Sequence, residues 1–173
     1  LSKYLKSIVG TKANVQIWDS NQTFELYPTG GGYYRIKRNN KVLDVTNGQA
    51  NPGTNVQIYE WNGSDAQQWK ILKNDDGSFQ IVSKLNENLA LDIDGATSSD
   101  KFKNGVNVHL YTKNNSDAQK WKLIPDNQST SVLTKDERVT DAYFEKYLIE
   151  NFAQVYDEAT HKIIGKATLT KNY

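Results

Sequence analysis

Hydrophobic and polar residues alternate in short runs along most of this chain, and polar turns separate the runs. Residues 33–37 and 79–83 both alternate, and each run follows a Gly- or Asn/Asp-rich segment that breaks regular structure. In both places a polar turn comes directly after the alternating run, and a second apolar run follows it, at 42–45 or at 89–93. Short runs bounded by Gly, Asn and Asp are typical of β-hairpins. The pattern therefore predicts an all-β region made of short strands.

The same phrases recur along the chain. A Gln-x-aromatic tripeptide closes each repeat, with the three closing aromatic residues 45 and 52 positions apart, and each of these tripeptides follows an Asn-Val-Gln-Ile-aromatic or Asn-Val-His-Leu-aromatic phrase. The tripeptides stand at 22–24, 67–69 and 119–121, and the phrases begin at Asn14, Asn55 and Asn107. A repeat of this length indicates symmetric units that cannot bury their apolar faces alone. We therefore expect the fold and the function to follow the repeat.

The first repeat is shorter than the others. The middle repeat, at about 33–72, and the last, at about 78–124, each predict four strands, whereas the first keeps only its second half, 14–27. Residues 1–9 are too short for an obvious strand-turn-strand pair. A threefold fold would then lack one hairpin. Either the N-terminal residues form an abbreviated version, or an upstream or C-terminal segment completes the closure.

The repeat pattern ends near Pro125. Residues 140–156 carry apolar side chains at helical spacing, which predicts an amphipathic helix, and residues 162–169 are typical of a strand. Basic residues do not dominate the polar face of this helix, so packing on this or a neighbouring domain or subunit is favoured over a membrane surface. We expect a repeat domain at 1–125 and a C-terminal extension at 126–173.

Composition and charge exclude several classes of protein. Lys and Arg number 21 against 20 Asp and Glu, and without a basic stripe we expect no nucleic-acid partner. No apolar run approaches the roughly 20 residues that span a bilayer. The absence of cysteine excludes disulfides and thiolate sites. The polar composition, and a first residue that is Leu rather than Met, favour a processed, secreted extracellular protein of bacterial origin.

The sequence lacks the common catalytic motifs. His109 and His161 lie in unrelated segments, and no metal-ligand spacing links them. The sequence has neither a Gly-x-Ser-x-Gly elbow nor a phosphate-binding loop. Acidic pairs such as Asp92 and Asp94 border polar stretches, where such pairs are usually solvated and do not serve glycoside hydrolysis. We therefore expect no enzyme activity, no catalytic residue, no metal and no cofactor.

The repeated polar and aromatic residues fit binding better. Each complete repeat has an Asp at a strand end, a polar residue and an aromatic on the next strand, and then the Gln of the tripeptide. The sets are Asp44, Gln57, Tyr59 and Gln67 in the middle repeat and Asp92, His109, Tyr111 and Gln119 in the last. A carboxylate accepts hydrogen bonds from vicinal sugar hydroxyls, and an aromatic face covers the apolar side of a pyranose. The alternative is that Asp and Gln brace turns; we expect Phe24, Trp69 and Trp121 to be core residues.

These motifs, with the Leu-Asp-Val and Leu-Asp-Ile strands, resemble the ricin-type β-trefoil lectins, also known as family-13 carbohydrate-binding modules, over about residues 12–125. The resemblance implies twelve strands in three units, a shared tryptophan core and up to one shallow sugar site per unit. It also implies that the two residue sets contact sugar, commonly a galactose-type one. Ala66 and Ala118 stand where the family has an Asn. The first unit keeps Gln16, Trp18 and Gln22 but shows no equivalent Asp.

We therefore expect a β-trefoil with a C-terminal helix-plus-strand extension, acting as the carbohydrate-binding lectin domain of a secreted bacterial protein. Its expected partners are exposed glycans, galactosides or related sugars first. The middle repeat has the fullest residue set and is expected to hold the best site. Two alternatives stay open: a targeting module of a larger toxin, glycoside hydrolase or protease, and a trefoil scaffold that binds proteins and no sugar.

Overall fold

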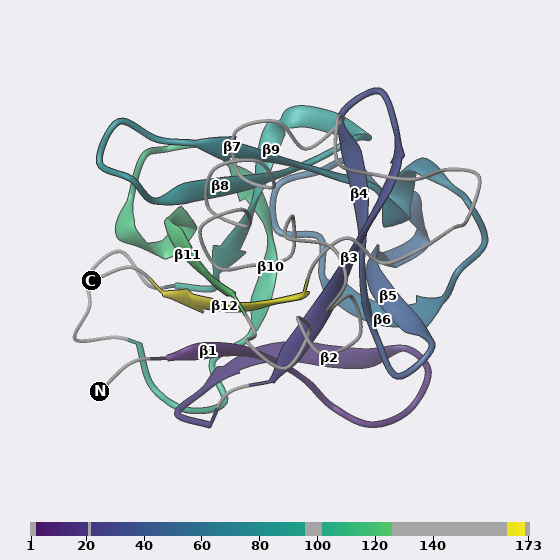
Figure 1. The fold of residues 1–173 in the computed structure, drawn as a ribbon, viewed down its shortest axis with the longest axis horizontal. Coiled ribbons are helices and arrows are strands. Elements are labelled where there is room, and N and C mark those ends of the chain that lie inside the picture. The colour runs from purple at the N-terminus through teal and green to yellow at the C-terminus, as the bar shows by residue number, and fades with distance from the viewer. Residues whose placement is uncertain (1–2, 21, 96–101, 126–165, 172–173) are drawn as a thin grey trace, which may run out of the picture.

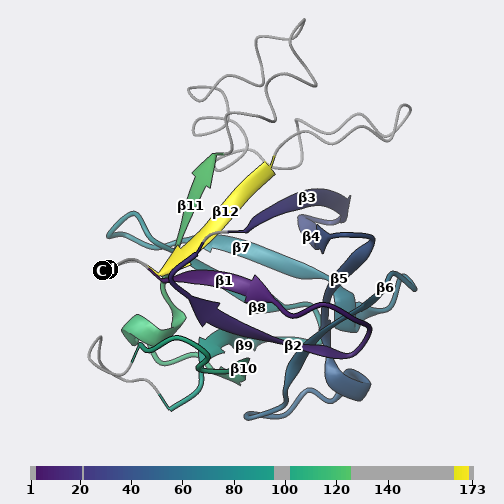
Figure 2. The ribbon, with the colours of Figure 1, turned by 90° about the horizontal axis from the view of Figure 1, so that it is seen from below.

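A computed structural model of the protein describes residues 3–20, 22–95, 102–125 and 166–171 (Figures 1 and 2). The described residues form twelve β-strands joined into one sheet, together with single turns of 3-10 helix. The predicted helix at 140–156 lies outside the described residues. The all-β class is confirmed for the part of the chain that is described.

The strands fall into the three units that the repeat predicts. The first unit contains β1 (Tyr4–Ser7), β2 (Ala13–Trp18) and β3 (Thr23–Gly30). The middle unit contains β4 (Tyr33–Arg38), β5 (Lys41–Val45), β6 (Val56–Glu60) and β7 (Trp69–Lys73). The last unit contains β8 (Phe79–Ser83), β9 (Asn86–Ile93), β10 (Val108–Thr112) and β11 (Trp121–Pro125). The last strand of the chain is β12 (Lys166–Lys171).

The opening strand of each complete unit has the same three neighbours. In the middle unit β4 pairs with β3 of the preceding unit, with β5 beside it in sequence, and with β7, the fourth strand of its own unit. In the last unit β8 pairs with β7, β9 and β11 in the same way. This threefold pattern is that of the expected β-trefoil.

The first unit is completed by β12. This strand pairs antiparallel with β11 of the last unit, with β1, and with β3. Those partners are the ones that an opening strand of the first unit would have, and Figures 1 and 2 show β12, in yellow, beside β11 and β1. The strand overlaps the one predicted at 162–169. The C-terminal segment therefore closes the short first repeat, which was one of the expected alternatives.

The tryptophans of the Gln-x-Trp motifs lie in the common core, as expected. Trp69 and Trp121 are both 0% exposed, and Phe24 of the first unit is equally buried. Each indole N–H donates to a backbone carbonyl oxygen at 3.1 Å, that of Leu43 or that of Leu91. A buried indole needs such a partner because an unpaired N–H would carry its full desolvation cost. The rings therefore join the fourth strand of a unit to its second.

The asparagines that begin the repeated phrases link the units. The side-chain amide of Asn55 donates to Asn14 Oδ1 at 2.7 Å, and that of Asn107 donates to Asn55 Oδ1 at 2.8 Å. The same segments pair through their backbones, with β2 joined to β6. Equivalent residues of three repeats thus meet one another, which gives the repeated Asn a structural role.

Candidate functional site

The predicted site residues lie on one hairpin in each unit, and the hairpins share one register. In the middle unit β5 and β6 place Asp44 opposite Gln57, with Leu43 opposite Ile58. The corresponding pairs on β9 and β10 are Asp92 with His109 and Leu91 with Leu110. The leucine of each pair faces the core because side chains alternate along a strand. The acidic residue that follows it therefore points to the opposite face of the hairpin.

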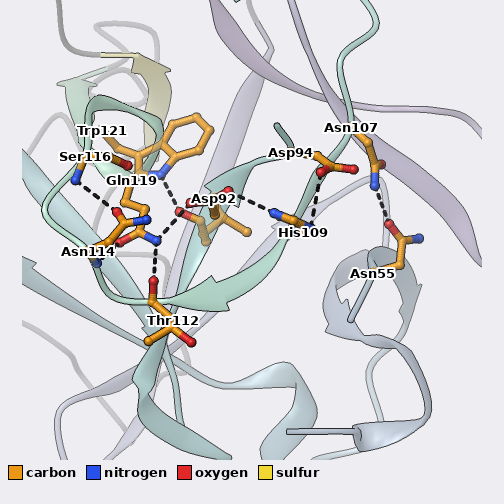
Figure 3. Close-up of polar contacts among 11 residues, drawn as sticks. Asn55, Asp92, Asp94, Asn107, His109, Thr112, Asn114, Ser116, Gln119 and Trp121 are labelled. Carbon is orange, nitrogen blue, oxygen red and sulfur yellow. Dashed lines mark hydrogen bonds and ion pairs between the residues drawn. The ribbon is translucent and has the colours of Figure 1, made fainter. Parts of the chain in front are cut away.

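The third unit holds its carboxylate between two donors (Figure 3). Asp92 is 5% exposed; its Oδ1 lies 2.8 Å from Nε2 of His109, and its Oδ2 accepts a hydrogen bond from Nε2 of Gln119 at 2.8 Å. The Gln119 amide also donates to the carbonyl oxygen of Thr112 and accepts from the backbone N–H of Asn114. Both ends of the amide are thus fixed. The carboxylate is positioned before any ligand arrives.

His109 links this carboxylate to a second one and to an aromatic ring. Its Nδ1 lies 3.8 Å from Oδ1 of Asp94, which is largely exposed. Its ring stacks on Tyr111, with centroids 5.5 Å apart and planes inclined by 9°. Tyr111 is 42% exposed, so part of its ring faces solvent. An exposed aromatic surface therefore stands beside a fixed carboxylate.

A hollow of about 250 Å³ opens over these groups, with Asp92, Asp94, His109, Tyr111, Asn114 and Ser116 in its lining. Pockets for drug-sized ligands begin at roughly 300 Å³. The hollow therefore suits one small polar ring. Asp94, Asn114 and Ser116 are not among the predicted site residues. The Asn-x-Ser phrase at 62–64 recurs at 114–116, and following the repeat further would have identified it.

The middle unit repeats the arrangement with an amide in place of the imidazole. Oδ1 of Asp44 accepts from Nε2 of Gln57 at 3.0 Å. Gln67 donates to the carbonyl oxygen of Glu60 and accepts from the backbone N–H of Asn62, both at 2.7 Å. Burial raises the pKa of Asp44 above its ordinary value, and hydrogen bonds from Gln57 and Gln67 oppose that rise.

Each predicted residue set is thus brought together on its own hairpin and the turn that follows it. Tyr59 lies on β6 and is half-buried, whereas the equivalent Tyr111 is exposed. Ala66 and Ala118 are buried in the 3-10 turns Asp65–Gln67 and Asp117–Gln119. At those two positions the structure offers no polar side chain to a ligand.

The first unit is built differently. Oε1 of Gln22 accepts from the backbone N–H of Ser7 at 2.9 Å, so this Gln braces β1. Where the other units have Asp, the register places Lys6 opposite Gln16. Nζ of Lys6 lies 4.6 Å from the centroid of the Trp18 ring. Sequence reasoning missed this lysine because the short N-terminal run did not reveal its register.

Among the described residues no group of three or more His, Cys, Asp or Glu side chains is placed to hold a metal ion. Within the same residues no helix has the length and apolarity needed to cross a membrane.

Comparisons with known proteins relate the chain to one family of domains. The family model for ricin-type beta-trefoil lectin domain-like sequences matches residues 20–111. The designed threefold-symmetric protein ThreeFoil is 32% identical, with a TM-score of 0.61, over 66% of this chain and 83% of its own. An exo-beta-1,3-galactanase from Clostridium thermocellum is 23% identical with a TM-score of 0.61, and the match covers 71% of this chain but 30% of the galactanase. A Polyporus squamosus lectin, solved with the human-type influenza-binding epitope, is 19% identical with a TM-score of 0.52, over 70% of this chain and 47% of its own.

Proposed function

This chain belongs to the family of ricin-type beta-trefoil lectin-like domains, and from that premise we propose that it binds exposed glycans through its second and third units. The observation that carries the proposal is the third-unit hairpin, where a fixed Asp92 stands beside the exposed ring of Tyr111 at the hollow. The proposal assigns no catalytic step to the described residues.

The proposed contacts follow from the geometry of the carboxylate. An ionised carboxylate has about four lone-pair positions, and His109 and Gln119 face one oxygen each of Asp92. The remaining positions accept hydrogen bonds from two neighbouring hydroxyls of a pyranose. Tyr111 covers the apolar C–H face of the same ring. Galactose-type sugars fit this division because their axial hydroxyl leaves one face continuous and apolar.

The middle unit supplies a second site of the same design. Asp44 takes the place of Asp92, Gln57 that of His109, and Tyr59 that of Tyr111. The residue set favours this unit, whereas the hollow and the exposed tyrosine favour the third. We propose that the third site binds more strongly. Two shallow sites on one molecule raise its avidity for a surface that displays many sugars.

The test is a titration of galactose and methyl β-galactoside against the full chain and its Asp44→Ala and Asp92→Ala variants. Each single variant should lose one site, and the double variant should lose binding altogether. Removing a hydrogen bond to an ionised partner costs about 1.5 to 3 kcal/mol, which is roughly tenfold or more in affinity. Asp75→Ala, an exposed aspartate in the turn between β7 and β8, is the matched control.

The outcomes separate the alternatives. If Asp44→Ala removes the stronger binding event, the proposed order of the two sites is wrong. If a glycan array shows no ligand for the full chain, or the double variant binds like the parent, sugar recognition through these aspartates is refuted. The remaining alternative is then a trefoil scaffold for protein contacts.

The wider setting is part of the proposal. We propose a secreted, extracellular protein in which this domain directs a larger toxin, glycoside hydrolase or protease to glycans. The support is that the match covers only 30% of the similar galactanase, so domains of this fold occur within larger enzymes. Sequencing the complete precursor and locating it in culture supernatant or cells would test this setting independently of sugar binding.

A further inference from the structure

The first unit carries a cation at the position where the other two carry the candidate sugar-binding carboxylate. In β1 and β2, Leu5 pairs with Ile17 and Lys6 with Gln16. Leu43 with Ile58, followed by Asp44 with Gln57, is the same register one repeat later. The third unit repeats it again. Lys6 is therefore the structural counterpart of the two aspartates, with its charge reversed.

The first unit keeps the aromatic residue of the site, whereas its Gln22 braces β1. Trp18 stands opposite Tyr4, as Tyr59 stands opposite Val42, so the aromatic position is filled. Lys6 is half-buried and its ammonium lies over the indole, which holds the long side chain against the ring. Among the described residues no carboxylate forms a salt bridge with Lys6.

A loop of the third unit borders this site. The backbone N–H of Gly105 donates to the carbonyl oxygen of Ile17 at 2.9 Å, next to the aromatic residue. Gly105 has a φ of +86°, and a Cβ there would lie 3.7 Å from Cζ3 of Trp18. Asn104 accepts from Nζ of Lys3 at 2.7 Å and donates to Oδ2 of Asp19 at 3.0 Å. This loop therefore lies beside one edge of the Trp18 indole.

A reversed charge changes the ligand that the position can hold. A carboxylate accepts hydrogen bonds from hydroxyls, whereas an ammonium only donates and pairs best with an anion. The indole still offers an apolar surface to a sugar ring. We propose that the first unit binds an acidic sugar, a pyranose bearing a carboxylate, with Lys6 on the carboxylate and Trp18 against the ring.

The proposal for the first unit rests on the sugar binding proposed for the other two units. It is therefore tested in a variant in which the aspartates of those two units are replaced. In the Asp44→Asn, Asp92→Asn background, galacturonate and galactose are titrated while the indole N–H resonance of Trp18 is followed by NMR. These two sugars differ at C6, where one carries a carboxylate and the other a hydroxymethyl group. Galacturonate should shift the Trp18 resonance and bind at least about tenfold more tightly than galactose, as a charge-assisted hydrogen bond predicts.

Variants of the lysine complete the experiment. Lys6→Gln should weaken galacturonate binding by about tenfold or more, whereas Lys122→Gln, at an exposed position of β11, should leave it unchanged. Lys6→Arg keeps the cation and should retain binding, which separates loss of charge from loss of fold. Equal shifts with galactose and galacturonate, or equal effects of Lys6→Gln and Lys122→Gln, would overturn the proposal. The proposal would be supported if the same background lost galactose binding and retained galacturonate binding.

Discussion

At the scale of single residues, the partner of the candidate carboxylate differs between units. The middle unit uses Gln57 and the third uses His109, at 3.0 and 2.8 Å from their aspartates. Both side chains reach a buried carboxylate oxygen, so either one satisfies it. The imidazole additionally stacks on Tyr111 and approaches Asp94.

We predict that His109→Gln keeps the third unit stable whereas His109→Ala does not. The glutamine can donate to Asp92 as Gln57 donates to Asp44, but alanine leaves a buried acceptor without that partner. Losing it should lower the free energy of unfolding by about 1 to 3 kcal/mol, measured by urea denaturation. Equal stabilities for the two variants would show that the contact with Asp92 contributes nothing.

The buried carboxyl of the middle unit predicts a pH dependence. Burial raises the pKa of Asp44 above its ordinary value of 3.8, so the carboxylate is lost at a higher pH than in an exposed aspartate. In an Asp92→Ala background, sugar affinity should therefore fall as pH is lowered from neutrality toward 3.8. Calorimetric titration over this range measures the fall. An affinity that stays constant down to that pH would contradict the assigned role of Asp44.

The contribution of Asp44 to folding stability depends on pH in the opposite direction to its contribution to sugar affinity. A raised pKa in the folded protein means that the fold disfavours the carboxylate form of Asp44. Its contribution to stability is therefore fully present below the unfolded pKa and is lost as pH rises through the folded pKa. Asp44→Asn should remove this dependence while leaving an amide of similar shape.

The buried tryptophans give a prediction with a matched control. Trp69→Ala should lower the free energy of unfolding by about 3 to 5 kcal/mol, because it empties the core and frees the carbonyl oxygen of Leu43. Trp61→Ala is the comparison, since Trp61 is 38% exposed and stacks with Arg35 at 4.9 Å. It should cost about 1 kcal/mol or less. A folded Trp69→Ala protein that lost only sugar affinity would contradict the core assignment.

At the scale of strands and hairpins, the sequence predicted the features that lie within a single repeat. Alternation and turn residues located the strands of the two complete units, and recurrence located both aspartates with their partners. The register of β1 could not be read, because its four residues lack the Leu-Asp phrase that marks β5 and β9. Lys6 was missed for that reason. Recognising it required the cross-strand pairs of the folded hairpin.

The pairing of strands that are distant in the sequence could not be predicted from sequence patterns either. A strand at 162–169 was predicted, but its partners β11, β3 and β1 are far away in the chain, and periodicity carries no information about them. The same holds for Asn14, Asn55 and Asn107, whose recurrence was evident while their mutual hydrogen bonds were not.

At the scale of the whole molecule, closure of the sheet depends on β12. Removing residues 126–173 takes away the partner that β12 provides to β11, β3 and β1. Unpaired edges expose backbone donors and acceptors that favour aggregation. We predict that a 1–125 fragment is less stable and associates, as measured by thermal unfolding and by size-exclusion chromatography with light scattering.

Two controls make this prediction specific. Adding a synthetic peptide of residues 164–173 to the fragment should restore stability in a concentration-dependent way, because binding to the folded state stabilises it. A scrambled peptide of the same composition should have no effect. A 1–125 fragment that is monomeric and as stable as the full chain would mean that β12 does not complete the sheet.

The pairing of the last strand with the first unit also sets a time order for biosynthesis. Residues 126–165 separate β11 from β12, and a ribosome adds about 5 to 20 residues per second, so β12 is made roughly 2 to 8 s after β11. During that interval the nascent chain holds nearly all of its repeats yet lacks the strand that completes its sheet. Chaperones that recognise unpaired strands therefore have seconds in which to bind the nascent chain. The speed of translation through residues 126–165 sets how long the incomplete sheet persists.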